Sequence, residues 1–158
     1  MISLKKEIEA IHSRFLTPDN PWGSGRDYCD KVDRECEKLW GITDKNRREY
    51  INDCGVFIHR SHENYTCGHC KVEISISQAP NAMYAWARSY HVGTGGSGFS
   101  ASVSNTEAYF SYAEARIAAI QNVHREIANQ LERLAVSHKP DALKMLALLN
   151  NEQQPSLL

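Results

Sequence analysis

The residues best suited to chemistry lie together in the segment Cys67-Gly68-His69-Cys70. Two cysteines separated by two residues, just before a strand, present two thiolates from one tight turn, which is half of a tetrahedral zinc site. Two histidines precede this segment at a spacing that suits a helical turn. In one interpretation these residues bind a zinc ion as cofactor, with the ligands Cys67, Cys70, His59 and His62, although plain thiols are favoured over zinc.

Two other interpretations of this segment compete with zinc. The cysteines can be plain thiols in a turn, with the histidines on a polar loop around residues 61–64. Thiol redox chemistry is also conceivable, because the four residues match the active site of disulfide isomerases. That chemistry needs a helix directly after the first cysteine, to lower its thiol pKa. Residues 71–77 instead alternate between apolar and polar as a strand does, so we do not expect redox catalysis.

Residues 93–98 fit the pattern Gly-x-Gly-x-x-Gly of dinucleotide-binding loops. Such a loop must open a helix whose N-terminus holds the pyrophosphate. Residues 99–104 alternate as a strand instead, so we expect a mobile hairpin loop at 93–98. No Ser/His/Asp or Cys/His set stands out by spacing, and the sequence predicts no enzyme. A metal-dependent hydrolase built on His59, His62 and Glu63 is the least favoured alternative.

The first part of the chain predicts helices. Apolar residues at steps of three and four indicate a helix over 3–16. Ser24 and Asp27 form a capping-box pattern for a second helix that stops at Gly41. A third helix is expected after residues 43–44, with Tyr50, Ile51 and Cys54 facing inward. Residues 56–58 either end that helix or start a strand.

The pattern changes at Cys70. Strands are expected at 71–77, 83–92 and 99–104, and a capping box at Ser111 and Glu114 opens the longest helix. A short helix follows at 141–149. The expected fold class is α+β: a helical N-terminal half, then a three-stranded antiparallel meander covered by a long amphipathic helix. We divide the chain into residues 1–66, 67–138 and 139–158, which together are expected to form one compact structure.

The long helix carries an apolar stripe that contains one histidine. In one interpretation His124 sits in a self-associating seam, which would make the protein a homodimer. In the other, it is an ordinary core histidine, or the buried stripe is rotated toward Val123. The expected stripe that includes His124 consists of Ala113, Ile117, Ile120, His124, Ile127, Leu131 and Leu134.

Charge and composition limit the classes of partner that we expect. The 158 residues carry 18 basic and 19 acidic side chains, a net charge of −1, which argues against a protein that binds nucleic acid by bulk electrostatics. The N-terminus lacks the apolar region of a secretory signal, and no apolar run approaches membrane-spanning length. Five cysteines are an odd number, which fits poorly with a disulfide framework. We expect a cytoplasmic protein without a membrane partner.

Residues 70–127 carry a pattern of four parts: a strand Val72-x-Ile74-x-Ile76, a strand Trp86-x-x-Ser89-Tyr90, a glycine-rich loop at 93–98, and the helix start Phe110-Ser111-x-x-Glu114-Ala115. In this pattern the segment resembles a module of prophage and plasmid accessory proteins. The resemblance implies an origin in a mobile element. It implies no reaction and carries over no catalytic residue.

These observations predict a non-enzymatic accessory protein of phage type that binds a host protein or protein complex. Inhibition of a host defence system, of the anti-restriction or anti-CRISPR kind, is one such role, and nucleic acid would then be reached through that complex. The expected anchors are aromatic side chains, which are common at interfaces: Tyr84, Trp86, Tyr90 and Phe99. The alternative is a zinc-stabilised module associated with nucleic acid, using basic groups such as Arg47, Arg48 and Arg60.

Overall fold

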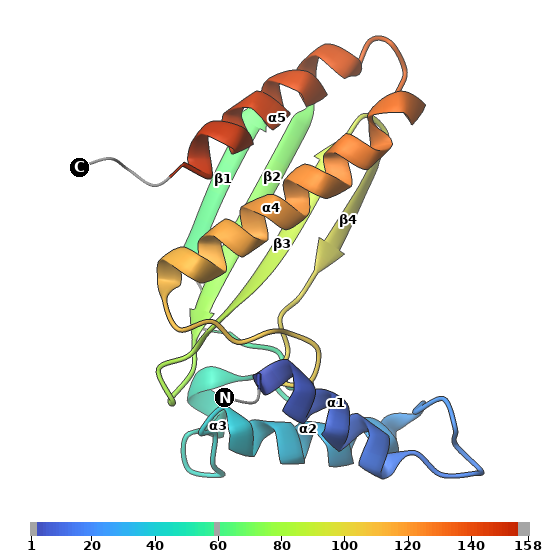
Figure 1. Ribbon diagram of the computed structural model, residues 1–158, viewed down its shortest axis with the longest axis vertical. Helices are drawn as coiled ribbons and strands as arrows, with labels where there is room; N and C mark the ends of the chain where they lie inside the picture. The colour runs from blue at the N-terminus through green and yellow to red at the C-terminus, as the bar shows by residue number, and fades with distance from the viewer. Residues whose placement is uncertain (1–2, 59–60, 155–158) are drawn as a thin grey trace. The chain divides into compact units, whose positions relative to one another are not determined.

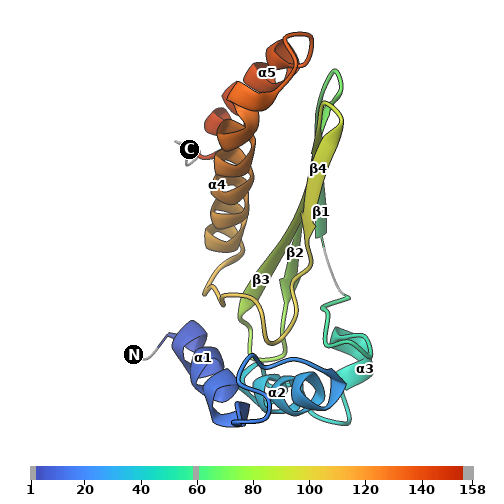
Figure 2. The same ribbon diagram turned by 90° about the vertical axis from the view of Figure 1, so that its right-hand side faces the viewer.

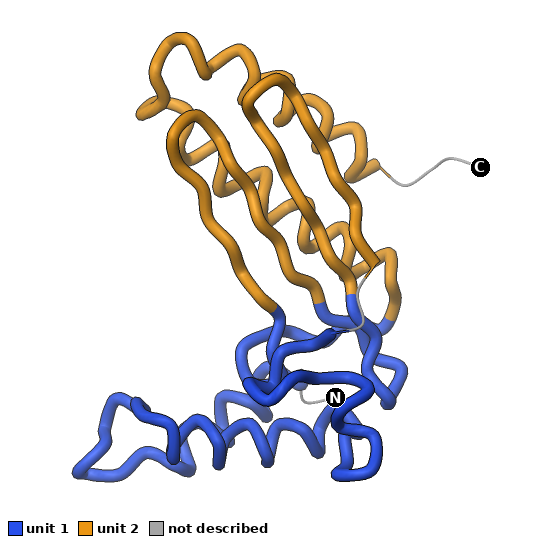
Figure 3. The backbone as a smooth tube through the Cα atoms, turned by 180° about the vertical axis from the view of Figure 1, so that it is seen from behind, with its two compact units in different colours: residues 1–60, 77–85, 101–110 blue, residues 61–76, 86–100, 111–158 orange. Residues whose placement is uncertain are grey.

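A computed structural model describes residues 3–58 and 61–154. The chain divides into two compact units, each assembled from three stretches of sequence (Figure 3). Unit 1 comprises residues 1–60, 77–85 and 101–110, and unit 2 comprises residues 61–76, 86–100 and 111–158. The expected domain boundaries at 66 and 138 therefore do not coincide with the compact units.

Unit 1 contains the helices α1 (Leu4–Phe15), α2 (Arg26–Leu39) and the single turn α3 (Arg47–Tyr50). Its core centres on Trp40, which is fully buried and makes an edge contact with Phe57 at 5.1 Å between ring centroids. The indole Nε1–H of Trp40 donates to the carbonyl of Val103 at 2.9 Å. A buried Trp N–H normally finds such a partner, and here the partner comes from the stretch 101–110.

Two expectations for unit 1 are wrong. Ser24 does not cap α2, because its backbone N–H and hydroxyl both donate to the side chain of Asn20, and the N-cap is Gly25 at φ 94°. The third helix is only one turn long, so the inward face expected over 50–54 does not form. Ile51 is buried, but Cys54 is exposed.

Unit 2 contains an antiparallel sheet of four strands in the order β1-β2-β3-β4. Helices α4 and α5 lie on one face of this sheet, and among the described residues of unit 2 no helix lies on the other face (Figures 1 and 2). The elements are β1 (Ser61–Cys67), β2 (Cys70–Gln78), β3 (Tyr84–Val92), β4 (Gly95–Phe99), α4 (Tyr112–Gln130), the 3₁₀ turn η1 (Leu131–Arg133) and α5 (Lys139–Glu152).

The α+β class predicted from the sequence is confirmed, but the sheet has four strands, not three. One missed strand is β1, which replaces the polar loop expected at 61–64. It pairs antiparallel with β2, with Glu63 opposite Ile74 and Cys67 opposite Cys70. Its first four residues are all polar, so the apolar alternation by which strands are recognised is absent there.

The other missed strand is β4, which occupies most of the expected glycine loop. The loop itself is only the turn at residues 93–94, with Gly93 at φ 60°. A glycine is required at position 96, because an added Cβ would lie 2.4 Å from the Tyr90 carbonyl oxygen. The strand expected at 99–104 ends at Phe99, and Val103 is buried in unit 1 instead.

The predicted start of α4 is confirmed, since Ser111 is its N-cap and the Ser111 hydroxyl accepts the Glu114 backbone N–H at 3.2 Å. The buried stripe is the alternative that is rotated toward Val123, and His124 is only half-buried. Helix α5 starts at Lys139 with Pro140 in its first turn, where a missing N–H costs nothing. Across the described residues, none of the helices combines the length and apolar character needed to cross a bilayer.

Candidate functional site

Strand β4 is an edge of the unit 2 sheet, since β3 is its neighbour on one side only. Residues 95–98 are exposed, and three of them are glycines. Edge strands are usually protected by charged side chains, by proline or by bulges, because their unpaired N–H and C=O groups can pair with another chain. Residues 95–99 carry no charge and no proline, so this edge is open to a further strand.

The pairing of β3 with β4 indicates which groups point outward. Val92 is paired with Gly95 across the two-residue turn, and Ser89 is paired with Gly98. Residues that flank a two-residue turn form a hydrogen-bonded pair, and such pairs alternate along an antiparallel ladder. The backbone groups of Gly96 and Gly98 are therefore expected to point away from β3, toward the edge.

Two of the four predicted aromatic anchors lie together beside this edge. Trp86 of β3 and Phe99 of β4 are both half-buried, and their ring centroids are 5.2 Å apart. Neither anchor is so deeply buried that a partner could not reach it. They offer an apolar surface next to the exposed backbone of β4.

The other two predicted anchors lie in different surroundings. Tyr90 is buried, its hydroxyl accepts from the Gln130 side chain at 2.5 Å, and the Arg88 guanidinium lies over its ring at 5.3 Å. Tyr84 belongs to unit 1, where its backbone N–H and C=O both pair with Tyr109. The structure thus brings Trp86 and Phe99 together and assigns structural contacts to Tyr84 and Tyr90.

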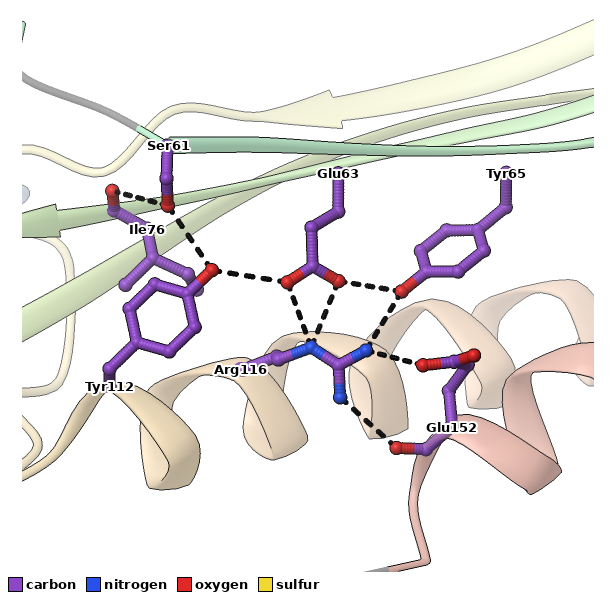
Figure 4. Close-up of polar contacts among 7 residues, drawn as sticks. All are labelled: Ser61, Glu63, Tyr65, Ile76, Tyr112, Arg116 and Glu152. Carbon is purple, nitrogen blue, oxygen red and sulfur yellow. Dashed lines mark hydrogen bonds and ion pairs between the residues drawn. The ribbon is translucent and has the colours of Figure 1, made fainter. Parts of the chain in front are cut away.

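A group of polar side chains centres on Arg116 of α4, which lies between β1 and the end of α5 (Figure 4). Its Nε–H donates to both carboxylate oxygens of Glu63, at 2.8 and 2.9 Å. Its Nη1 donates to the backbone carbonyl of Glu152 at 3.1 Å, and its Nη2 contacts the Glu152 carboxylate at 2.5 Å. We call Glu63, Tyr65, Tyr112, Arg116 and Glu152 the Arg116 cluster.

Two tyrosines complete the Arg116 cluster from either side of the carboxylate. Tyr65 donates its hydroxyl proton to one oxygen of Glu63 at 2.6 Å and accepts from Arg116 at 3.1 Å. Tyr112 donates to the other oxygen of Glu63 at 3.1 Å. With both carboxylate oxygens and the guanidinium engaged within the protein, the cluster fastens α4 and α5 to β1 and has no group directed at a ligand.

The pKa values of the Arg116 cluster follow from these contacts. Burial raises the pKa of the Glu63 carboxyl, but hydrogen bonds from Arg116 and Tyr65 outweigh that effect, so the pKa is lowered overall. Burial, followed by the hydrogen bond to Glu63, raises the pKa of Tyr65 to about 12. The hydrogen bond to Glu63 raises the pKa of Arg116. These pKa shifts favour an ionised Glu63, a protonated Tyr65 and a charged Arg116.

The structure separates one predicted zinc ligand, His62, from the two predicted cysteine ligands. Cys67 and Cys70 lie directly opposite each other on β1 and β2, which puts both side chains on the same face of the hairpin. His62 lies five residues before Cys67, about 17 Å away at the usual rise of a strand. It lies on the opposite face, where it contacts Ser75 and Glu73. His59 lies outside the described residues, as does Arg60 of the basic group.

Unit 1 contains a hollow of about 660 Å³, a size typical of small-molecule sites. Burial raises the pKa of the Asp33 carboxyl at its wall, although a hydrogen bond from the Ser104 hydroxyl opposes that shift. His12 contacts the Tyr28 hydroxyl at 2.8 Å and the Ser104 carbonyl at 2.9 Å, which requires Nε2 to carry the proton. Both ring nitrogens of His12 are therefore engaged in holding unit 1 together.

Of the basic residues named for the nucleic-acid alternative, the structure describes Arg47 and Arg48. Arg47 pairs with Glu37 at 3.0 Å and contacts Asp53 at 3.9 Å, so its charge is largely balanced. Arg48 is exposed.

Sequence reasoning missed the residues that hold the sheet and helices of unit 2 together. Glu63 and Arg116 are 53 positions apart, and no spacing rule links them. His138 and Asp141 lie just before and inside the first turn of α5, beside the Cys67–Cys70 hairpin. The pattern His-x-x-Asp was visible in the sequence, but its place next to the cysteines depends on the packing of α5.

No protein-family model matches this chain, and no curated protein or solved structure matches it either.

Proposed function

We propose that this protein is a binding module that recognises another protein by adding an extended segment of that partner to β4. The observation that carries the proposal is the open, uncharged edge formed by residues 95–99, with Trp86 and Phe99 in contact beside it. In strand addition, backbone hydrogen bonds supply affinity and neighbouring side-chain surfaces supply specificity.

The chemistry of the edge defines the expected partner segment. No residue of β4 is charged, so the segment is expected to be extended and low in charge. The aromatic pair favours an apolar side chain at the position that faces Trp86 and Phe99. A host protein or protein complex is the partner class that the sequence predicts, and a role against a host defence system is a special case of it.

A proline at position 98 tests the mode of binding. Gly98→Pro removes the N–H that a partner strand would use, at a position where an added Cβ meets nothing within 4 Å. Gly98→Ala is the matched control, because it adds the same Cβ and keeps the N–H. Peptides selected from a random display library on the wild-type protein should bind Gly98→Ala with similar affinity and should lose most binding to Gly98→Pro.

Two results would count against the proposal. Selected peptides that bind Gly98→Pro as well as the wild type would place the binding surface elsewhere. Failure to enrich any peptide, with self-association of the wild-type chain that Gly98→Pro abolishes, would indicate that β4 pairs with a second copy of this chain. Size-exclusion chromatography with light scattering measures that self-association.

A further inference from the structure

The tip of the β1–β2 hairpin and the start of α5 bring together two pairs of metal-ligating residues. The hairpin supplies Cys67 and Cys70, three positions apart. The helix start supplies His138 and Asp141, also three positions apart and therefore on one face of the helix. All four residues belong to unit 2.

Contacts with the two turn residues between the cysteines place the start of α5 at the tip of the hairpin. The Asp141 carboxylate accepts the backbone N–H of His69 at 3.0 Å, and it lies so close to the turn that a Cβ at Gly68 would be 2.3 Å from its Oδ2. The ring of His138 makes an edge contact with the ring of His69, with 6.2 Å between centroids.

One atom at this place lacks the partner that its burial demands. Nδ1 of His138 is buried and has no hydrogen-bond partner, and it is the only side-chain nitrogen or oxygen of the described residues in that condition. Buried polar atoms are nearly always paired, and an exception commonly marks a missing water or ion. Nδ1 of a neutral imidazole is a common metal ligand.

We propose that Cys67, Cys70, His138 and Asp141 form a binding site for a zinc ion. Two thiolates, one imidazole and one carboxylate are ligand types that zinc accepts in a tetrahedral site. The proposal keeps the two cysteines predicted from the sequence and takes the other two ligands from α5. It is independent of the β4 edge, because the two sites share no residue.

Side chains must move for the ion to bind. As they stand, the described residues contain no group of three His, Cys, Asp or Glu side chains placed to hold a metal. Burial, together with the nearby Cys67 and Asp141, raises the pKa of the Cys70 thiol to about 11, so the metal-free site holds a protonated thiol. Zinc binds cysteine as the thiolate, so a Zn–S bond forms in place of the S–H bond of a thiol and that proton goes to solvent.

Titration of the reduced, metal-free full-length chain with Co²⁺ tests the site, because thiolate-bound tetrahedral Co²⁺ has a characteristic visible absorption. We expect one Co²⁺ per chain, displaced by Zn²⁺. Cys67→Ser should abolish the thiolate–metal charge-transfer band, and His138→Ala should weaken binding by about 100-fold, the loss of one ligand being at least as costly as that of an outer-shell partner. Cys70 is buried, so the half-exposed Cys67 is the safer substitution.

Matched controls are available within the chain. Cys29→Ser removes an exposed thiol of unit 1, and His62→Ala removes a histidine of β1 on the opposite face of the hairpin. Neither should change the Co²⁺ spectrum or its affinity. Circular dichroism of each variant shows whether it is folded.

Three outcomes would overturn the proposal. The reduced chain binds no Co²⁺ or Zn²⁺; the ion is bound but depends on His62 and not on His138; or binding survives Cys67→Ser unchanged, which would indicate adventitious surface binding. Intact-mass measurement after mild oxidation adds a further check. If Cys67 and Cys70 lose two hydrogens to form a disulfide while the reduced chain takes up no metal, the pair is a thiol couple and not a zinc site.

Discussion

The two ends of α5 are attached to the β1–β2 hairpin in opposite ways. At its C-terminal end, Glu152 joins the Arg116 cluster, in which each carboxylate oxygen of Glu63 and each nitrogen of the guanidinium has a partner. At its N-terminal end, His138 and Asp141 meet the hairpin tip, and one imidazole nitrogen has none. A saturated polar cluster stabilises, whereas an unsaturated one can still accept a ligand.

Among changes at the two ends of α5, substitution of Arg116 should have the largest effect on stability. Arg116→Leu leaves the half-buried Glu63 without its counter-charge, so the free energy of unfolding should fall by about 3 kcal/mol, the low end for a broken buried ion pair because the cluster is partly exposed. Urea denaturation measures the change. Arg125→Leu, at an exposed position of the same helix, should change stability by less than about 0.5 kcal/mol. Equal effects of the two would show that the Arg116 cluster is dispensable.

Crowding at the hairpin tip should have the next largest effect. Gly68 has φ 57°, and an added Cβ would collide with the Asp141 carboxylate. Gly68→Ala should lower the free energy of unfolding by about 2 kcal/mol from backbone strain and this collision. The double variant Gly68→Ala/Asp141→Ala should recover the part of the stability loss that comes from the collision. Gly98→Ala, whose added Cβ lies in open space, should leave the free energy of unfolding unchanged. A Gly68→Ala protein as stable as the wild type would mean that α5 does not rest on the turn.

Lowering the pH should weaken the Arg116 cluster at the C-terminal end of α5. Because the pKa of Glu63 is lowered in the folded protein, its ionised form contributes stability above its usual value of 4.5, and this is lost as the pH falls through the folded pKa. At pH 7, Glu63→Gln should be less stable than the wild type by about 1.5 kcal/mol, the scale of a hydrogen bond to a charged group. Thermal melts from pH 7 to pH 3 should show this difference shrinking. A constant difference would mean that Glu63 is neutral in the folded protein.

Removal of the unpartnered nitrogen should have the smallest effect on the metal-free chain. His138→Leu replaces a buried polar atom that makes no hydrogen bond, so the free energy of unfolding should change by less than about 1 kcal/mol. With Zn²⁺ present, the wild type should gain stability and the variant should not. Denaturation with and without Zn²⁺ measures both. A large loss in the metal-free variant would instead assign His138 a structural role.

The sequence predicted the elements whose apolar residues alternate or recur regularly. Strand β2, helix α1 and the start of α4 follow directly from Val72, Ile8 and Ser111 and their neighbours. Strands β1 and β4 were missed because neither alternates between apolar and polar residues: β1 presents Glu63 and Tyr65 to the helices, and β4 consists mainly of glycine. Their positions are determined by the partner strand, which local sequence does not encode.

The candidate sites were predictable to the same extent. The paired cysteines and the aromatic residues were recognisable from their type and spacing. The contacts of Arg116 with Glu63 and of Asp141 with the hairpin tip were not, because both depend on how helices far along the chain pack on the sheet. Long-range polar contacts of this kind leave no periodic signal.

The assembly of unit 1 from distant stretches has a consequence for synthesis of the protein. Trp40 receives its hydrogen-bond acceptor from Val103, 63 positions later, and His12 contacts Ser104, 92 positions later. A nascent chain that has emerged only as far as α3 lacks the residues that accept hydrogen bonds from the Trp40 indole and the His12 imidazole. Unit 1 therefore cannot complete its folding until the ribosome has released residues 101–110, and until then its N-terminal helices are accessible to proteases and chaperones.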